Sequence, residues 1–218
     1  MKKQVVVIGL GRFGRSVCKQ LYDLGHEVLA IDIKEERVNE VSNYSYYAVL
    51  ANASDENALK NYGVKNFDYA IVAIGDNIES SILCTLILKD MGLKEVWVKA
   101  RDPHHRKILE KVGADRIIQP EKEMGVRIAN QLDSGNLLDY IEISNEYSIV
   151  ELVATEKNSG KSLVQLDVRA KFGCTILAIK RKGNVNISPM PDDVILKGDI
   201  LVVMGQINDL KRFEKKGF

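Results

Sequence analysis

Apolar residues in the first 120 positions fall into six short runs, separated by segments in which apolar side chains recur at helical spacing. The runs predict strands at 4–8, 28–32, 47–50, 69–75, 95–99 and 116–119, with helices at 15–24, 34–42, 55–62, 78–91 and 105–112. Continuous apolar runs are typical of strands buried on both faces by helices. The pattern therefore predicts an α/β domain over residues 1–120, a Rossmann-like, doubly wound parallel sheet.

The pattern changes after Pro120. Apolar residues at Met124, Ile128 and Leu132 predict a helix over 121–132, residues 133–136 break it, and an apolar pattern resumes over 137–143. We interpret 121–143 as a helical connector that also serves dimerisation.

Residues 144–218 do not continue the regular alternation of strands and helices seen in residues 1–120. Short strands are expected at 148–154, 175–180, 184–188 and 200–204, with helices at 162–171 and 208–213. Gly183-Asn184 and Gly198-Asp199 suit turns between strands. This predicts a small α+β C-terminal domain, of a size that suits ligand sensing.

The chemistry begins at Gly9-x-Gly11-x-x-Gly14, where the first strand passes into a helix. In this fingerprint Gly9 permits the tight turn, Gly11 lets backbone approach a pyrophosphate, and Gly14 allows close helix–strand packing. The helix N-terminus adds free N–H groups and a positive dipole end. The motif predicts a nucleotide site that includes Leu10 and Phe13; a glycine-rich turn without ligand is the alternative.

Two side chains refine this hypothesis. Asp32 ends the second strand about 20 residues on, where an acid accepts from ribose hydroxyls and repels the 2′-phosphate of NADP. Arg12 lies within the loop, where a guanidinium can hold a third phosphate, in its own site or a neighbouring subunit's. The alternative for Asp32 is a helix cap without a ligand, and the alternative for Arg12 is a solvated side chain.

Further candidates follow the other strands, because ligands of open α/β sheets bind at the carboxyl ends of strands. These are Ile33, Lys34 and Arg37, then Asn52, Ala53 and Ser54, then Ile74 and Gly75, then Lys99 and Arg101. Glu121 follows the last strand and could bind a divalent ion held by phosphates.

Composition argues against several classes of protein. Lys and Arg number 31 against 30 acids, so no bulk charge favours nucleic acid or a membrane surface. No apolar run approaches the roughly 20 residues of a membrane span, and a signal peptide is not evident. Cys18, Cys84 and Cys174 are expected to be buried free thiols. We therefore expect a soluble cytosolic protein.

An enzyme is not expected. His104 and His105 are adjacent, lack metal ligands at suitable spacing, and suggest solvated residues at a helix start. The C-terminal domain contains no histidine and no recognisable nucleophile–base pair. An NAD-dependent oxidoreductase or redox sensor remains the alternative; a DNA-binding regulator would need a helix-turn-helix and a basic face.

Several motifs together resemble an RCK domain, a regulator of potassium conductance. They are the glycine loop with Arg12, 51–54 (ANAS), 71–75 (IVAIG), 98–100 (VKA) and 113–121 (GADRIIQPE). The stretches 148–152, 167–173 and 198–202 resemble the smaller C-terminal RCK domain. The likeness covers essentially the whole chain and is greatest to regulatory subunits of bacterial Ktr-type potassium uptake systems. Asn52 departs from the pattern, since many RCK domains carry Asp there.

This resemblance implies a homo-octameric ring of dimers beneath a membrane-embedded potassium channel subunit. It implies competition of ATP and ADP for the glycine-loop site, with NAD or NADH bound in some members. Arg12 then matches the γ-phosphate ligand, Asp32 the ribose ligand, and Glu121 the carboxylate that places Mg²⁺ or Ca²⁺. The resemblance further implies inhibition by cyclic di-AMP, with a phosphate contact at Arg169 and apolar contacts from Leu163, Val164, Ile176 and Pro191.

Overall fold

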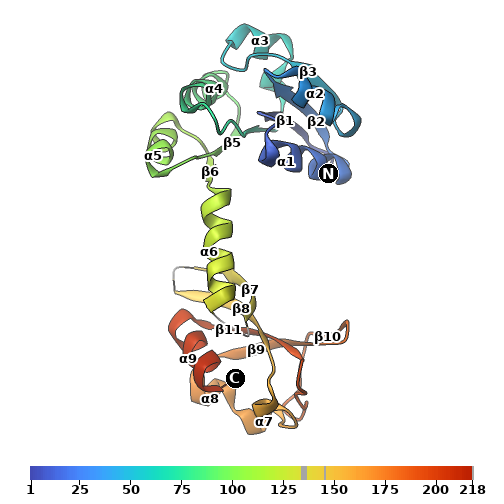
Figure 1. Cartoon of the computed structure of the whole chain (residues 1–218), viewed down its shortest axis with the longest axis vertical. Coiled ribbons are helices and arrows are strands. Elements are labelled where there is room, and N and C mark those ends of the chain that lie inside the picture. The colour runs from blue at the N-terminus through green and yellow to red at the C-terminus, as the bar shows by residue number, and fades with distance from the viewer. Residues whose placement is uncertain (134–136, 145, 218) are drawn as a thin grey trace. The chain divides into compact units, whose positions relative to one another are not determined.

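The computed structural model describes residues 1–133, 137–144 and 146–217, in two compact units, Met1–Pro120 and Glu121–Phe218 (Figure 1). The N-terminal unit contains one parallel sheet of six strands in the order β3-β2-β1-β4-β5-β6. Its strands are β1 (Gln4–Ile8), β2 (Glu27–Asp32), β3 (Tyr47–Leu50), β4 (Tyr69–Val72), β5 (Glu95–Lys99) and β6 (Arg116–Ile118). This order reverses between β1 and β4, which is the arrangement of dinucleotide-binding sheets and confirms the predicted Rossmann-like fold.

Alternate residues of each central strand enter two separate cores. Val5 and Val7 of β1 pack in one core, whereas Val6 and Ile8 pack in the other. The first core is covered by α1 (Arg12–Asp23) and α2 (Glu35–Val41), the second by α3 (Glu56–Asn61), α4 (Ile78–Asp90) and α5 (Pro103–Val112). Burial of both sheet faces explains why these strands are uninterrupted apolar runs.

The C-terminal unit contains an antiparallel sheet in the order β10-β9-β11-β8-β7. Its strands are β7 (Leu137–Glu142), β8 (Tyr147–Val153), β9 (Thr175–Arg181), β10 (Asn184–Asn186) and β11 (Ile200–Gln206). The helices are α6 (Pro120–Asp133), α7 (Leu163–Leu166), α8 (Val168–Phe172) and α9 (Ile207–Gly217). Leu152, Leu201, Val203 and Phe213 are almost fully buried in its core. The α+β character expected for this unit is confirmed.

Two local expectations about this unit were wrong. Only Pro120–Asp133 of the expected helical connector 121–143 is helical, and Leu137–Glu142 is a strand hydrogen-bonded to β8. Pairing with a neighbouring strand cannot be seen in the apolar pattern of one short segment. Of the break expected at 133–136, Asp133 is the last residue of α6, and 134–136 lie outside the described residues. The helix expected over 162–171 is divided in two, because Asp167 adopts the left-handed conformation, with φ of 46°.

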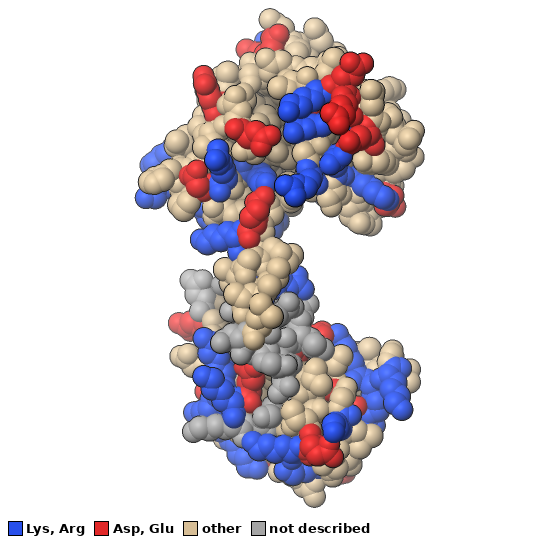
Figure 2. Space-filling view, viewed as in Figure 1, with Lys and Arg blue, Asp and Glu red and all other residues tan. Residues whose placement is uncertain are grey.

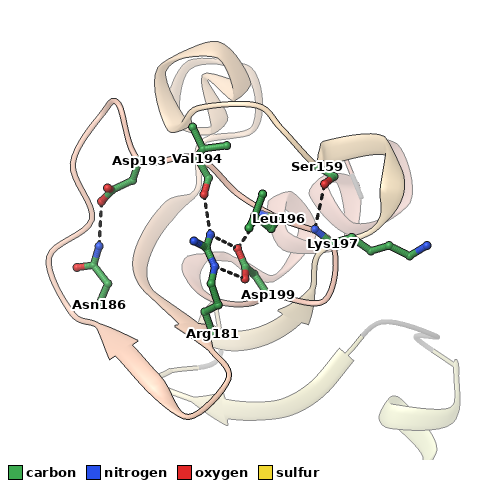
Figure 3. Close-up of polar contacts among 8 residues, drawn as sticks. All are labelled: Ser159, Arg181, Asn186, Asp193, Val194, Leu196, Lys197 and Asp199. Atoms are coloured by element: carbon green, nitrogen blue, oxygen red, sulfur yellow. Dashed lines mark hydrogen bonds and ion pairs between the residues drawn. The ribbon is translucent and has the colours of Figure 1, made fainter.

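An ion pair between a partly exposed arginine and a buried aspartate ties the β9–β10 hairpin of this unit to the loop before β11 (Figure 3). Arg181 donates from Nε to Asp199 Oδ1 at 2.8 Å and from Nη2 to Asp199 Oδ2 at 2.6 Å. Its Nη2 also donates to the carbonyl of Val194 at 2.7 Å, and the Leu196 N–H donates to Asp199 at 2.7 Å. Asp199 is only 2% exposed. The hydrogen bond from Arg181 is the main cause of a lowered pKa at Asp199.

His105 is a second residue whose position was not expected. It is 1% exposed, rather than solvated at the helix start. Helix α5 begins at Pro103, two residues earlier than predicted, because Asp102 accepts from the N–H groups of His104 and His105. The ring Nδ1 accepts from the Arg101 N–H at 3.2 Å, while Nε2 is buried without a partner among the described residues. Burial lowers the pKa of His105.

This burial predicts a pH-dependent stability of the N-terminal unit. Below about pH 6.5 the unfolded chain takes up a proton at His105 that the folded unit resists, so the free energy of unfolding should fall as the pH drops. We expect His105→Gln to remove most of that dependence between pH 7 and 5, measured by urea unfolding at several pH values. His104→Gln changes an exposed neighbour and is the matched control. An unchanged slope in His105→Gln would contradict the assignment.

Candidate nucleotide-binding site

The glycine loop joins β1 to α1 at the point where the strand order reverses, and two of its glycines are fixed by close contacts. Gly9 has φ of +90°, which L side chains rarely adopt. A Cβ on Gly14 would lie 1.9 Å from the Gly9 carbonyl oxygen. By contrast, nothing lies within 4 Å of a Cβ on Gly11, so that position faces open space. The loop is therefore packed on its protein side and open at Gly11.

The start of α1 has the features of an anion site. Gly11 is its N-cap, and no side chain accepts from the first N–H groups of the helix. Arg12 is the first helical residue, is exposed, and has no partner among the described residues. A free guanidinium and free N–H groups thus occur together at the loop, as the sequence predicted.

Asp32, at the end of β2, is a buried carboxylate that contacts the loop directly. Its Oδ2 accepts from the Leu10 N–H at 2.6 Å and its Oδ1 from the Lys34 N–H at 2.9 Å. Asp32 is 5% exposed. A carboxylate has about four acceptor positions, so these contacts fix its orientation and leave capacity for ribose hydroxyls.

Arg37 and Lys99 place positive charge on either side of the loop. Arg37 Nη1 lies 3.5 Å from Asp32 Oδ2, and its Nη2 lies 3.6 Å from Asp76 in the loop after β4. Lys99 Nζ lies 5.7 Å from the centre of the Phe13 ring and 3.8 Å from a Cβ on Gly75. The structure thus brings the residues after β1, β2, β4 and β5 together. Asp76 belongs to the stretch 74–77 after the fourth strand, where the sequence led us to expect ligand contacts.

The other candidates after β2 and β3 lie next to Asp32. The Ala51 N–H donates to the Asp32 carbonyl at 3.0 Å, which joins the ends of these two strands. Asn52 accepts from the Ser54 N–H at 3.0 Å in a tight turn, and Ala53 is buried in the core. Ile33 is a large apolar side chain that is 66% exposed. An exposed isoleucine beside Asp32 offers a surface for a flat ring.

Of the three remaining candidates, Ile74 lies against the loop, because its backbone nitrogen is 3.0 Å from the position that a Cβ on Gly9 would take. Ile74 packs against the core at the end of β4, and Arg101 follows β5 with an exposed side chain. Glu121 lies in the first turn of α6, which belongs to the C-terminal unit. Among the described residues no group of three or more His, Cys, Asp or Glu could hold a metal ion.

Most of the residues expected to contact cyclic di-AMP lie around α7. The Val164 N–H donates to the Pro191 carbonyl at 2.9 Å, and the Leu163 N–H donates to the Asp193 carbonyl at 3.0 Å. Leu163 and Ile176 pack against the same core, while Val164 is 61% exposed. Arg169 lies on α8, exposed and without a partner among the described residues. This side of the unit combines apolar surface with a free guanidinium.

Charges of both signs are mixed on the visible face of each unit (Figure 2). This agrees with the nearly balanced composition. None of the helices in the described part of the chain is long and apolar enough to cross a membrane.

Comparison with known proteins identifies the family. Residues 5–120 match the TrkA-N domain and residues 148–216 match the TrkA-C domain. The chain is 57% identical over 215 residues to Ktr system potassium uptake protein A of Bacillus subtilis, covering 99% of this chain and 97% of that protein. It is 51% identical over 216 residues to Ktr system potassium uptake protein C of the same organism, covering 99% and 98%.

Two solved structures are also similar to the chain, although the family assignment rests on the domain matches and the Bacillus subtilis relatives. The GsuK channel bound to NAD is 16% identical, with a TM-score of 0.67 over 96% of this chain and 38% of that one, which shows the fold alone. The C-terminal RCK domain of the potassium transport protein KtrA, solved with cyclic di-AMP, is 48% identical over 40% of this chain and 96% of that one, with a TM-score of 0.32. The chain therefore belongs to the Ktr family of potassium uptake proteins, non-enzymatic regulatory RCK subunits built of a TrkA-N and a TrkA-C domain.

Proposed function

We propose that this chain gates a membrane-embedded Ktr-type potassium subunit in response to adenine nucleotides bound at the glycine loop. The observation that carries this proposal is Arg12, which has no partner among the described residues and lies at the start of α1, where no side chain caps the helix. Asp32 is held at the same loop by the hydrogen bond from the Leu10 N–H. ATP and ADP share the adenosine and two phosphates, so only a group that reaches the third phosphate can tell them apart. Arg12 supplies such a group, to a nucleotide in its own subunit or in a partner's.

The proposed ligand set extends the glycine-loop site. Gly9, Gly11 and Gly14 shape the phosphate cradle, Lys99 adds charge beside it, and Asp32 accepts from the ribose. Ile33, Lys34, Arg37 and residues 52–54 border the adenosine, with Ile74, Gly75 and Arg101 along the opposite strands. NAD and NADH are alternative ligands of the same pocket. Glu121 is proposed to anchor Mg²⁺ or Ca²⁺ beside the phosphates of ATP.

We further propose that the protein is cytoplasmic, peripheral at the inner face of the membrane, and assembles as homodimers into a homo-octameric ring. Residues 121–143 would link a nucleotide-binding domain, 1–120, to a ligand-sensing domain, 144–218, and contribute to dimerisation. Exposed Met124, Val126 and Ile128 on α6 support that role, because apolar side chains on a solvent-facing helix favour association. Cyclic di-AMP is proposed to inactivate transport through Arg169, Leu163, Val164, Ile176 and Pro191.

For ATP to switch the ring, it must bind the active geometry more tightly than ADP does, since equal affinities would shift no population. We therefore expect Arg12→Ala to bind ADP within about twofold of wild type and to lose about tenfold or more in ATP affinity, the value of one charge-assisted contact. Isothermal titration of the purified protein with each nucleotide measures this. Arg106→Ala removes an exposed arginine from α5 and is the matched control.

The same titrations test the cation and the identity of the nucleotide. Wild type should prefer ATP over ADP more strongly with Mg²⁺ or Ca²⁺ than without. In Glu121→Gln the cation should no longer increase this preference. Equal loss of ADP and ATP in Arg12→Ala would count against the switch. Tight NADH binding together with indifference to ATP would replace the proposal with a redox sensor.

A further inference from the structure

A cavity lies in the C-terminal unit, formed by α7, α8, α9 and the short helical turn Glu156–Asn158. Its volume is about 430 Å³, within the range of small-molecule sites. Its walls combine lysines with apolar side chains, chiefly Lys157, Lys161, Lys171, Leu166, Phe172 and Phe213. None of the residues proposed above for nucleotide or cyclic di-AMP binding lines it.

The floor of the cavity is apolar and firmly packed. The rings of Phe172 and Phe213 lie 5.2 Å apart at an angle of 60°, and Phe213 is 1% exposed. Leu166 and Phe172 are half-buried against the core of the unit. Because these side chains are held by the core, the floor offers a preformed surface for a flat apolar group.

Lys161 and Lys171 place two ammonium groups on the wall of the cavity. Lys171 Nζ donates to the carbonyls of Gln165 at 3.4 Å and Leu166 at 3.1 Å, which fixes the ammonium at the end of α7. Lys161 has an exposed side chain with no partner among the described residues. The nearby acid Glu156 is paired with Lys197 at 2.6 Å, and the described lining includes no carboxylate. In this part of the chain, as far as the structure describes it, two ammonium groups border one cavity without a counter-ion from the protein.

We propose that this cavity binds a phosphate monoester with a planar apolar body. The dianionic phosphate would lie between Lys161 and Lys171, and the body would pack on the half-buried side chains of Leu166 and Phe172, with Phe213 supporting them from below. Charge-assisted hydrogen bonds from two lysines match a dianion better than a neutral or singly charged head. Such a site would be separate from both proposed nucleotide-type sites, although α7 and α8 also carry Leu163, Val164 and Arg169.

The test uses phenyl phosphate as the probe and the full-length protein saturated with ADP, so that the glycine loop is occupied. Wild type should bind phenyl phosphate more tightly than inorganic phosphate or phenol, each of which has half of the required chemistry. Lys161→Ala should weaken phenyl phosphate binding about tenfold, because one charge-assisted contact is lost. Lys211→Ala removes an exposed lysine of α9 outside the cavity and should leave binding unchanged.

Lys171→Gln provides a second variant, with thermal unfolding measured in parallel because Lys171 also contacts the end of α7. A loss of binding with an unchanged melting temperature supports the site. Three results would overturn the proposal: no binding by wild type, equal weakening by Lys161→Ala and Lys211→Ala, or displacement of phenyl phosphate by cyclic di-AMP.

Discussion

Gly14→Ala is expected to unfold the glycine loop and abolish nucleotide binding. A Cβ at this position would lie 1.9 Å from the Gly9 carbonyl oxygen and 3.2 Å from the Ala73 side chain. In an ordinary helix, alanine in place of glycine stabilises by up to about 1 kcal/mol. Here a clash with the backbone outweighs that gain. We expect the free energy of unfolding of the N-terminal unit to fall by about 3 kcal/mol or more. Urea unfolding and ATP titration measure the two effects.

Gly11→Ala is the matched control, because it adds the same methyl group three residues earlier. Gly11 has φ of −66°, and nothing lies within 4 Å of the position that the added methyl group would take. Stability should therefore change by less than about 1 kcal/mol. Nucleotide affinity should still fall, since the methyl group occupies the space in which a pyrophosphate approaches the backbone. Normal ATP binding by Gly11→Ala would show that the phosphates lie elsewhere.

Arg181→Ala is expected to have the largest effect on the C-terminal unit. The variant leaves the Asp199 carboxylate, 2% exposed, without its bidentate partner, and the Val194 carbonyl without a donor. Breaking a buried ion pair costs about 3–5 kcal/mol, and the 43% exposure of the Arg181 side chain places the expected loss near the lower figure. Thermal unfolding of the full chain, followed by circular dichroism, measures the change.

Two further measurements separate this pair from general surface electrostatics. Because the pKa of Asp199 is lowered in the folded unit, the pair stabilises fully above about pH 4 and its contribution is lost as the pH falls through the folded pKa. Asp199→Asn should flatten that acid dependence. Lys197→Ala breaks the exposed pair with Glu156 in the same region and should cost at most about 1 kcal/mol. Similar losses in Lys197→Ala and Arg181→Ala would contradict the argument.

The sheet of the N-terminal unit could be predicted because its central strands β1, β2 and β4 are buried on both faces, which leaves uninterrupted apolar runs in the sequence. The C-terminal unit was less predictable in detail. The left-handed Asp167 divides one expected helix into α7 and α8, and an aspartate gives little warning of that conformation. Strand β7 was mistaken for part of a connector, since it is defined by hydrogen bonds to β8, a partner in the fold.

In the candidate site, residues of one local motif could be predicted, whereas contacts between segments distant in sequence could not. Gly9, Gly11, Gly14 and Asp32 could be found because their spacing reflects one strand–turn–helix unit. The link from Arg37 to Asp76 joins helix α2 to the loop after β4, and only the sheet order brings these two segments together. His105 was placed wrongly because its burial depends on packing within the fold, whereas the residues around it in the sequence also suit a solvated helix start.

The three buried cysteines bear on which signals can reach this molecule. All are free, and burial raises the pKa of Cys18 and Cys174 to about 11 and that of Cys84 to about 12. At neutral pH only about one thiol in 10⁴ or fewer is ionised, so peroxides and disulfides find almost no nucleophile to attack. Oxidants are therefore poor inputs through these thiols. If adenine nucleotides gate the protein as proposed, its activity would follow the ratio of ATP to ADP in the cell and not the oxidation of these thiols.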